Sequence, residues 1–354
     1  HKKDTPMRIS TLLSYAKGFK EAAVEVAELE QAGLDVVWVP EAYSYDAPSA
    51  MGYLASVTQR VTIASGILPL YSRTPSLLAM TAAGIDYLSD GRCMLGLGAS
   101  GPQVIEGFHG VPYTAPVSRL REIIEICRMV WRRERVQHDG KYYQIPLPQN
   151  QGTGLGKPLK LINHPVREEI PIAIAALGEK SVAMTAELAD AWLPAFYTAE
   201  AAEAVWGDAL RAGAAKRDPA REPLEVFAGG GVAIGKGLEH LRDAGRAGAA
   251  LYIGGMGARQ KNFYNDIFSK SGYADEAKLI QDLYLAGDKK AAEAAIPDSY
   301  LAKNSLIGEP GFVSERLHAL RESGVTALNV GFAGETTADR VKTCEQLRKL
   351  VDDL

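Results

Sequence analysis

Eight short apolar runs, separated by helical patterns or loop residues, most constrain what this chain can fold into. Runs rich in Val, Ile and Ala are typical of parallel strands that are covered on both faces. Eight such strands, joined by covering helices, close into a (β/α)8 TIM barrel. The sequence therefore predicts this α/β fold, with strands at Arg8–Leu13, Val36–Val39, Val61–Leu68, Cys93–Leu97, Pro171–Ala175, Ala191–Leu193, Leu224–Ala228 and Ala327–Val330.

Glycines at the joints between helical and strand patterns support this alternation. Gly33 precedes the second run and Gly324 precedes the eighth, where a helix end favours a left-handed residue. Two insertions exceed a minimal barrel, at about residues 133–170 and 237–310. In the first, before the fifth strand, Asp139-Gly140 predicts a β-hairpin with a type I′ turn. The second, between the seventh and eighth strands, has mainly helical patterning, and we expect one domain over residues 1–354.

The stretch Gly96–Gly101 reads G-x-G-x-x-G, the glycine pattern of dinucleotide-binding Rossmann folds. That fold requires a helix directly after the glycines, so that its N-terminal amides face the pyrophosphate. Here Pro102 and Gly107 follow, and helical periodicity does not resume until about Leu120. We therefore expect a long loop at the carboxyl end of a barrel strand, and a Rossmann dehydrogenase is the least favoured interpretation.

Composition and charge exclude several classes of protein. A net charge of -4 over 354 residues gives no basic surface for nucleic acid, and no apolar run is long enough to cross a membrane. The three cysteines lie far apart, and the histidines lack metal-ligand spacing, so we expect neither a disulfide nor a metal site. Reduced core cysteines indicate a cytoplasmic protein.

Residues at the carboxyl ends of barrel strands face the active site. In this chain they include few acid–base groups, which favours hydride transfer through a bound cofactor, with a small molecule as substrate. Glu41 follows the second strand. It is a solvated loop carboxylate, a helix cap, or a contact to a cofactor ring or substrate hydroxyl. Gly178–Ser181 opens a helix after the fifth strand; these residues either hold a phosphate, with Lys180, or serve as an ordinary turn and cap.

Several segments, taken in order, resemble the bacterial-luciferase-like barrel family. They span nearly the whole chain and comprise Val36–Glu41, Ser65–Pro69 with Arg73–Pro75, Gly96–Gly98 after Arg92, the Asp-Gly hairpin and Ala175–Gly178. Within that family, the second insertion resembles actinobacterial oxidoreductases that use the deazaflavin coenzyme F420, which are relatives of methylenetetrahydromethanopterin reductase and F420-dependent glucose-6-phosphate dehydrogenase. The segments concerned are Gly254–Gly257, Asn262–Tyr264 and Ser305–Gly308.

The resemblance implies a set of cofactor-binding residues. Gly66-Ile67 matches the bulge behind the deazaflavin ring, where the family has a non-proline cis peptide bond. Ala42 follows Glu41 where the glucose-6-phosphate enzyme has a histidine, so its sugar-oxidising acid–base chemistry is not expected here. The residues implied as cofactor contacts are Glu41, Ser65, Gly66, Ile67, Gly98, Ala99, Ser100, Gly101, Ala176, Leu177, Gly178, Glu179 and Lys180.

These observations predict an oxidoreductase that moves a hydride between F420 and a small organic substrate, with Glu41 as the candidate catalytic group. The alternatives are an FMN-dependent monooxygenase of the same fold and a non-catalytic flavin-binding protein. F420 differs from FMN in a polyglutamate tail, for which Lys180, Arg259 and Lys261 are candidate cationic contacts. Because family members are commonly dimers, we expect a homodimer. The residues expected to line the substrate pocket are Tyr15, Tyr43, Tyr71, Trp192 and Phe332.

Overall fold

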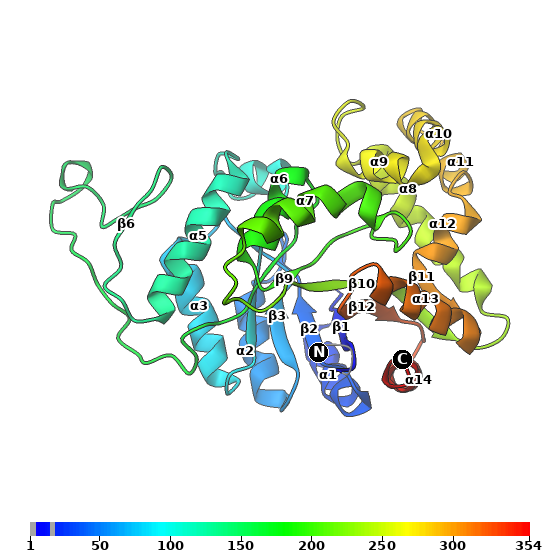
Figure 1. Ribbon diagram of the computed structural model, residues 1–354, viewed down its shortest axis with the longest axis horizontal. Helices are drawn as coiled ribbons and strands as arrows, with labels where there is room; N and C mark the ends of the chain where they lie inside the picture. Colours follow the sequence, from blue (N-terminus) through cyan, green and yellow to red (C-terminus); the bar gives the residue numbers. More distant parts are fainter. Residues whose placement is uncertain (1–4, 15–17) are drawn as a thin grey trace.

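A closed parallel barrel forms the centre of the molecule (Figure 1). The computed structural model describes residues 5–14 and 18–354. In this part of the chain each barrel strand pairs in parallel with its neighbours, and β10 pairs with both β9 and β12, which closes the sheet. The predicted (β/α)8 barrel is confirmed. Its strands are β1 (Arg8–Leu12), β2 (Val36–Val39), β3 (Thr62–Ser65), β5 (Cys93–Gly98), β8 (Ile172–Ile174), β9 (Ala191–Trp192), β10 (Glu225–Ile234) and β12 (Ala327–Phe332).

Every predicted run overlaps one of these strands, but two of the runs differ clearly from expectation. The run at 61–68 breaks after β3, and the short strand β4 (Leu68–Pro69) follows and pairs with β5. The break falls at Gly66-Ile67, whose peptide bond is cis as the family resemblance implies. β10 continues past Ala228, because its second half pairs with β11 (Ser305–Gly308), a strand that the sequence analysis did not predict.

Helices surround the barrel and begin and end at residues suited to those positions. Thr74 and Thr336 accept backbone hydrogen bonds at the N-termini of α3 and α14. Gly33 and Gly324 both have φ of 112°, the left-handed conformation expected at the two joints. The covering helices are α1 (Phe19–Ala32), α2 (Ala47–Val57), α3 (Pro75–Leu88), α5 (Pro116–Trp131), α6 (Glu179–Leu188), α7 (Ala202–Lys216), α13 (Pro310–Glu322) and α14 (Thr337–Asp352).

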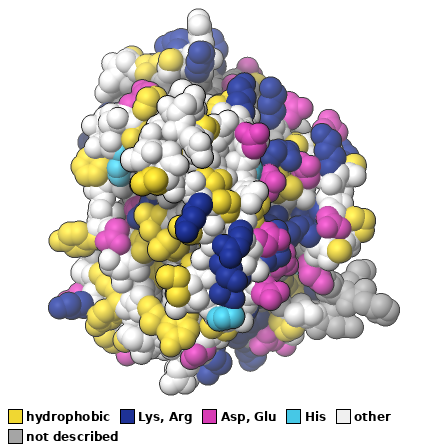
Figure 2. Space-filling model, turned by 90° about the vertical axis from the view of Figure 1, so that its left-hand side faces the viewer, with side chains coloured by type: hydrophobic (Ala, Val, Ile, Leu, Met, Phe, Trp, Pro, Cys, Tyr) yellow, Lys and Arg dark blue, Asp and Glu magenta, His cyan; other side chains and the backbone are white. Residues whose placement is uncertain are grey.

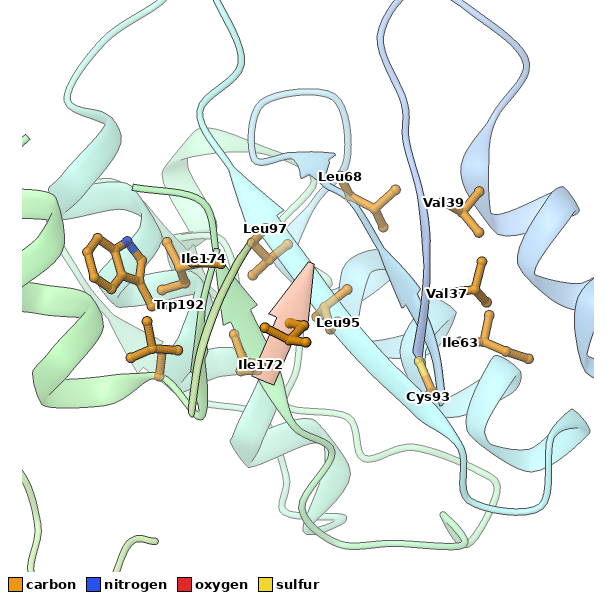
Figure 3. Close-up of a cluster of buried hydrophobic side chains, with 14 of the residues drawn as sticks. Val37, Val39, Ile63, Leu68, Cys93, Leu95, Leu97, Ile172, Ile174 and Trp192 are labelled. Atoms are coloured by element: carbon orange, nitrogen blue, oxygen red, sulfur yellow. The ribbon is translucent and has the colours of Figure 1, made fainter. Parts of the chain in front are cut away.

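Successive strand residues point alternately into the barrel and toward the helices. On β2, Trp38 fills the barrel interior, where its ring packs edge-on against Phe227 at a centroid distance of 5.1 Å. Val37 and Val39 instead join the larger apolar layer between strands and helices. Figure 3 shows part of this layer, to which neighbouring strands contribute Val37, Ile63, Leu95 and Trp192 among others.

The first insertion contains the predicted hairpin, with β6 (His138–Asp139) antiparallel to β7 (Gln144–Ile145). The expected type I′ turn is wrong, because the loop spans residues 140–143 and neither Asp139 nor Gly140 has a positive φ. Glu122 on α5 explains the wider loop: its carboxylate accepts hydrogen bonds from the amides of Tyr142 and Tyr143, at 3.1 and 3.2 Å. The loop is therefore shaped by the helix beneath it.

The second insertion is mainly helical, as expected, and it has an apolar core of its own that includes Ile253, Phe268 and Ile280. Its elements stand to one side of the barrel in Figure 1. They are the 3₁₀ helix η2 (Glu239–Gly245), α8 (Arg246–Gly255), α9 (Phe263–Phe268), the π-helical turn η3 (Ser269–Tyr273), α10 (Ala274–Leu285), α11 (Lys289–Ala294), α12 (Asp298–Lys303) and β11.

The segment after Gly96–Gly101 corrects one expectation. A short helix, α4 (Pro102–Gly107), begins immediately, whereas no helix was expected before about Leu120. Pro102 occupies the first helical turn, where a residue without an amide proton costs nothing, so it starts the helix rather than preventing it. The Rossmann interpretation is still excluded, because the sheet closes into a barrel.

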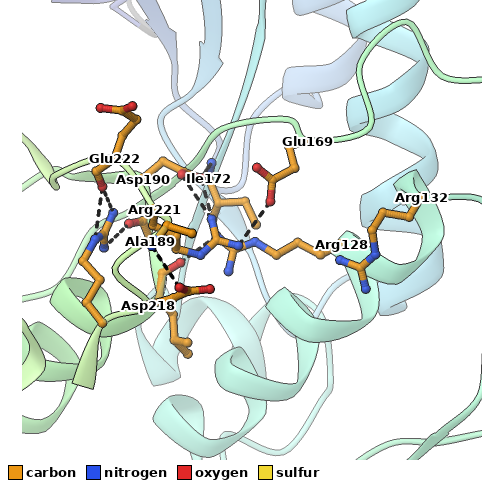
Figure 4. A network of polar contacts seen from close by, with 12 residues as sticks. Arg128, Arg132, Glu169, Ile172, Ala189, Asp190, Asp218, Arg221 and Glu222 are labelled. Atoms are coloured by element: carbon orange, nitrogen blue, oxygen red, sulfur yellow. Dashed lines mark hydrogen bonds and ion pairs between the residues drawn. The ribbon is translucent and has the colours of Figure 1, made fainter.

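A network of ion pairs lies at the end of the barrel where the strands begin, here named the base (Figure 4). Asp190 precedes β9, and its carboxylate accepts a hydrogen bond from the amide of Ile172 at the start of β8, at 2.8 Å. Arg128 from α5 and Arg221 each lie 3.5 Å from the same carboxylate. Arg221 also contacts Glu169 at 3.2 Å. The network joins two strands to a covering helix.

Candidate functional site

A cavity of about 640 Å³, here named the mouth cavity, lies beside the carboxyl ends of β5, β8 and β9. This volume is in the range of cofactor sites. Its walls are mainly apolar, with Glu179 and Lys180 as the charged residues among those that line it. The lining consists of Ile67, Leu70, Gly98–Ser100, Tyr113, Pro116, Val117, Leu120, Ile174–Ser181, Met184, Leu193, Ala195, Phe263 and Tyr264.

Many of the predicted cofactor contacts meet in the mouth cavity, although they come from three segments far apart in the sequence. They meet because the carboxyl ends of parallel barrel strands share one face of the fold. Those in the lining are Ile67, Gly98, Ala99, Ser100, Ala176, Leu177, Gly178, Glu179 and Lys180. The lining does not include Glu41, Ser65, Gly66 or Gly101. That any of these residues contacts a cofactor stays a prediction.

The first two glycines of the G-x-G-x-x-G stretch are required by packing between strands. A Cβ atom on Gly96 would lie 1.7 Å from the backbone oxygen of Ser65, and one on Gly98 would lie 2.8 Å from Cδ1 of Ile67. The buried Ser65 hydroxyl bonds both backbone groups of Gly96, at 2.7 and 2.8 Å. These glycines therefore let the break after β3 approach β5, which brings Ile67 to the cavity wall.

The N-terminus of α6 faces the mouth cavity without a capping side chain. Gly178 is the capping residue, and the Ser181 hydroxyl donates back to the Gly178 carbonyl at 3.0 Å rather than to solvent. Helix N-termini carry backbone donors and a partial positive charge, which makes them suitable sites for anions. Lys180 adds a full positive charge, and it has no ion pair or hydrogen bond with the described residues. This end of the cavity can hold a phosphate.

Glu41 is not a solvated loop residue, since its side chain is only 7% exposed. Arg73 donates to both carboxylate oxygens, at 2.7 and 2.8 Å, and the amide of Ala47 at the start of α2 donates to one of them at 2.7 Å. The sequence analysis included Arg73 in a family segment but did not pair it with Glu41. That Glu41 contacts a cofactor ring or a substrate stays a prediction.

The expected substrate-pocket residues do not meet in one place. Trp192 was expected to line the pocket, and this is wrong: it is fully buried between strands and helices, where its indole donates to the Ala176 carbonyl at 2.9 Å. Its neighbour Leu193 lines the cavity instead. Tyr43 is largely exposed, Tyr71 lines a second cavity, Phe332 is half-buried at the end of β12, and Tyr15 lies outside the described residues.

Sequence reasoning missed several aromatic and apolar residues of the lining. Tyr113 and Leu120 come from α5 and the loop before it, and Phe263 and Tyr264 come from α9 in the second insertion. Only the last two gave a signal, as part of the family segment Asn262–Tyr264. Of the cations proposed for a polyglutamate tail, Lys180 is at the cavity, but Arg259 is paired with Asp282 on the insertion and is absent from the lining.

The described part of the chain gives no indication of a disulfide, a metal site or a membrane-spanning helix. The cysteines Cys93, Cys127 and Cys344 are buried and free. No group of three or more His, Cys, Asp or Glu residues is placed to hold a metal ion among the described residues. None of the described helices combines the length and the hydropathy that a bilayer span requires.

The chain is similar to proteins of a known family over most of its length. Residues 5–327 match the family described as luciferase-like monooxygenase. The chain belongs to this luciferase-like family. A Mycobacterium tuberculosis protein, provisionally named a coenzyme F420-dependent oxidoreductase, is 38% identical over 333 residues, which are 92% of this chain and 94% of that protein. The family resemblance seen in the sequence is thereby confirmed.

Two solved structures share the fold of this luciferase-like chain. The F420-dependent tetrahydromethanopterin reductase of Methanopyrus kandleri has a TM-score of 0.76 at 19% identity and covers 98% of both chains. The FMN-bound oxygenating component of a Pseudomonas putida diketocamphane monooxygenase has a TM-score of 0.67 at 19% identity and covers 99% of both chains. Members of this fold with either ring system thus resemble the chain over its whole length.

Proposed function

We propose that this protein is a coenzyme F420-dependent oxidoreductase that transfers a hydride between the deazaflavin and a small organic substrate. The observation that carries the proposal is the mouth cavity, where Ile67, Gly98–Ser100 and the uncapped start of α6 converge from three segments. The 38% identity to a mycobacterial protein named for F420 supports this cofactor over FMN.

The residues of the mouth cavity fit a deazaflavin cofactor. The α6 amides and Lys180 would hold its phosphate, and Ile67 with the glycine-lined end of β5 would form a wall for its flat ring. When bound, F420 supplies a ring carbon that accepts or donates a hydride. Phe263 and Tyr264 of the second insertion would exclude water from that carbon. Tyr113 lines the same cavity, and its hydroxyl donates to the Ser100 carbonyl at 3.3 Å. Burial raises the pKa of its phenol, so Tyr113 would stay protonated and would act on a substrate as a hydrogen-bond donor.

The test is a parallel titration of the apoprotein with F420 and with FMN, followed by ring absorbance or fluorescence. Under the proposal, F420 binds more tightly than FMN, and the reduced complex is stable in air because a reduced deazaflavin reacts slowly with oxygen. The FMN alternative is favoured by the likeness to the diketocamphane enzyme. Tighter FMN binding, with oxygen consumption on addition of a flavin reductase and NADH, would establish that alternative. Tight F420 binding without any turnover would indicate the binding protein.

We also propose that the protein is a homodimer. The first insertion carries exposed apolar residues, among them Leu155 and Ile162, which are 83% and 90% exposed. Figure 2 shows hydrophobic side chains on the side of the molecule that carries this insertion. Exposed apolar groups gathered on one surface are typical of an interface. Ile162→Asp should yield monomers in sedimentation velocity, whereas Val24→Asp, on exposed α1, should not. Dimers that persist in the first variant would exclude this face.

A further inference from the structure

A second cavity, of about 690 Å³ and here named the side cavity, adjoins the mouth cavity. It lies between the start of α3, the first turns of α5 and the hairpin β6–β7, and it shares Leu70 with the mouth cavity. Tyr71 lines the side cavity and Tyr113 lines the mouth cavity, and their rings lie 5.1 Å apart. The two cavities therefore meet at Leu70 and beside this pair of tyrosine rings.

The lining of the side cavity is electropositive. It contains two arginines, Arg73 and Arg119, and no aspartate or glutamate. Glu41 neutralises Arg73. Among the described residues, Arg119 bonds only to Thr114, with Nε donating to the carbonyl at 2.9 Å and Nη2 donating to Oγ1 at 3.1 Å. Its charge therefore has no counter-ion within the described chain.

The Arg119 guanidinium is held in place by aromatic rings. Its central carbon lies 4.9 Å from the ring centroid of Tyr142 and 5.8 Å from those of Tyr71 and Tyr143. Cation–π contacts of this kind position a guanidinium through its faces and leave its edge donors available. No described group accepts from Nη1, so this donor is free for a ligand. A side chain fixed in this way loses little conformational freedom on binding an anion.

The start of one helix adds to the positive potential, and the place of Arg119 in a second helix favours a bound anion. Thr74, Pro75 and Ser76, at the start of α3, line the cavity. Arg119 lies in the first turns of α5, where a cation is unfavourably placed with respect to the helix dipole, and no acidic residue occupies the first turn to offset it. An arginine in such a position is a cost to folding, and a bound anion would remove that cost.

We propose that the side cavity is an oxyanion subsite, in which Arg119 binds a carboxylate on a molecule whose reactive part occupies the mouth cavity. Two sources supply this chemistry under the proposed function: the glutamate tail of F420 or a carboxylate on the substrate. Tyr142 and Tyr143, which carry phenol hydroxyls, also line the cavity. The inference rests on the proposed function for these sources, but the presence of an anion site can be tested without F420.

The first experiment uses benzoate, a carboxylate on a flat ring, with benzamide as its neutral counterpart, and follows binding to the apoprotein by saturation-transfer NMR. Benzoate should bind more tightly than benzamide, and Arg119→Gln should weaken benzoate binding by about tenfold or more, since a charge-assisted pair is lost. Arg121→Gln is the matched control, because Arg121 lies on the same helix but is paired with Glu187. Equal benzoate affinity in the two variants, or equal affinity for benzoate and benzamide in the wild type, overturns the proposal.

Arg119→Lys keeps the charge without the forked donors, and it provides a second reading if the glutamine variant does not fold. Benzoate should bind this variant less tightly than wild type, and unchanged binding overturns the role given to the guanidinium donor Nη1.

The source is then identified with F420 that carries several glutamates and with F420 that carries none. If the tail is the ligand, the wild type prefers the long form and Arg119→Gln abolishes the preference. If benzoate binding depends on Arg119 but the tail makes no difference, the ligand is a substrate carboxylate. Failure of both forms of F420 to bind the wild type overturns the proposed function and leaves the benzoate result standing.

Discussion

The base and the mouth of the barrel differ in whether their polar groups have hydrogen-bond partners within the protein. At the base, where the strands begin, acidic side chains accept hydrogen bonds from amides near the start of neighbouring strands. Asp35 accepts from Ile9 and Asp190 from Ile172, both at 2.8 Å. At the mouth, the start of α6 has no capping side chain, and Lys180 has no partner among the described residues.

This difference indicates that the polar groups of the base contribute to stability and those of the mouth to ligand binding. A carboxylate that accepts hydrogen bonds from strand amides cannot be removed without leaving those donors unpaired. An unpaired donor at a cavity costs little while water reaches it, and it gains free energy only when a ligand arrives. We therefore expect substitutions at the base to change the free energy of unfolding, and substitutions at the mouth to change ligand binding.

The largest effect is expected at the base. Asp86 is 1% exposed and accepts from the guanidinium of Arg167 and, at 3.0 Å, from the amide of Cys93 at the start of β5. Asp86→Ala should lower the free energy of unfolding by about 3–5 kcal/mol, because it leaves a buried amide and a partly buried arginine without an acceptor. Urea unfolding measures this, and F420 affinity of the folded fraction should not change. A loss below about 1 kcal/mol would contradict the structural role of the base.

The Glu41–Arg73 pair tests whether position or pairing decides the role of a polar group, because the pair lies at the mouth but its charges are compensated as at the base. If Glu41 acts on cofactor or substrate, Glu41→Gln should lower turnover by roughly ten- to a hundredfold while the protein stays folded. Steady-state kinetics at saturating F420 and a thermal melt measure the two effects on one sample. Normal turnover with a lowered Tm would assign the pair to packing alone.

Lys180 tests the mouth directly. Lys180→Gln should weaken F420 binding by about tenfold, since the anion loses one positive partner, and the difference should shrink as salt is added. The free energy of unfolding should stay within about 0.5 kcal/mol of wild type. Lys342→Gln, an exposed site on α14, is the control and should leave both quantities unchanged. If F420 binding depends on salt to the same extent in the two variants, Lys180 does not contact the phosphate.

Glu30 gives the smallest and most pH-dependent effect. Burial alone would raise the pKa of Glu30, but hydrogen bonds from the amides of Val61, Arg60 and Gln59 outweigh it, so the pKa is lowered on folding. A lowered pKa stabilises the fold above the ordinary value of about 4.3, and the contribution is lost as pH falls through the folded value. The Tm difference between wild type and Glu30→Gln should therefore be largest near neutral pH and narrow in acid. A constant difference would contradict this linkage.

The polar groups of the base and the residues of the mouth also differ in how far sequence could predict them. The strands and the glycine joints are local patterns, and they predicted the barrel because alternating βα units close in few ways. The same patterns misplaced local details: Pro102 begins α4, and Asp139-Gly140 does not form a type I′ turn. In each case the local preference was compatible with more than one structure.

Site residues were predictable where they follow a strand, as at Gly98–Ser100 and Ala176–Lys180, because strand ends converge on one face. Trp192 was misassigned because, in a strand this short, a shift of one residue exchanges the cavity side for the helix side. Arg119 gave no signal, since an arginine within an amphipathic helix is ordinarily a solvated residue.

The sequence by itself determined the fold class, the family and the strand-end segments of the mouth cavity, because these depend on periodicity and on residues close together in the chain. Only the tertiary structure decided which charges are compensated. Arg73 has Glu41 as its partner, whereas Arg119 faces three tyrosines and no acid in the described chain. The reason is physical: ion pairing depends on distances of a few ångströms between residues from different elements, and those distances exist only after the barrel has closed.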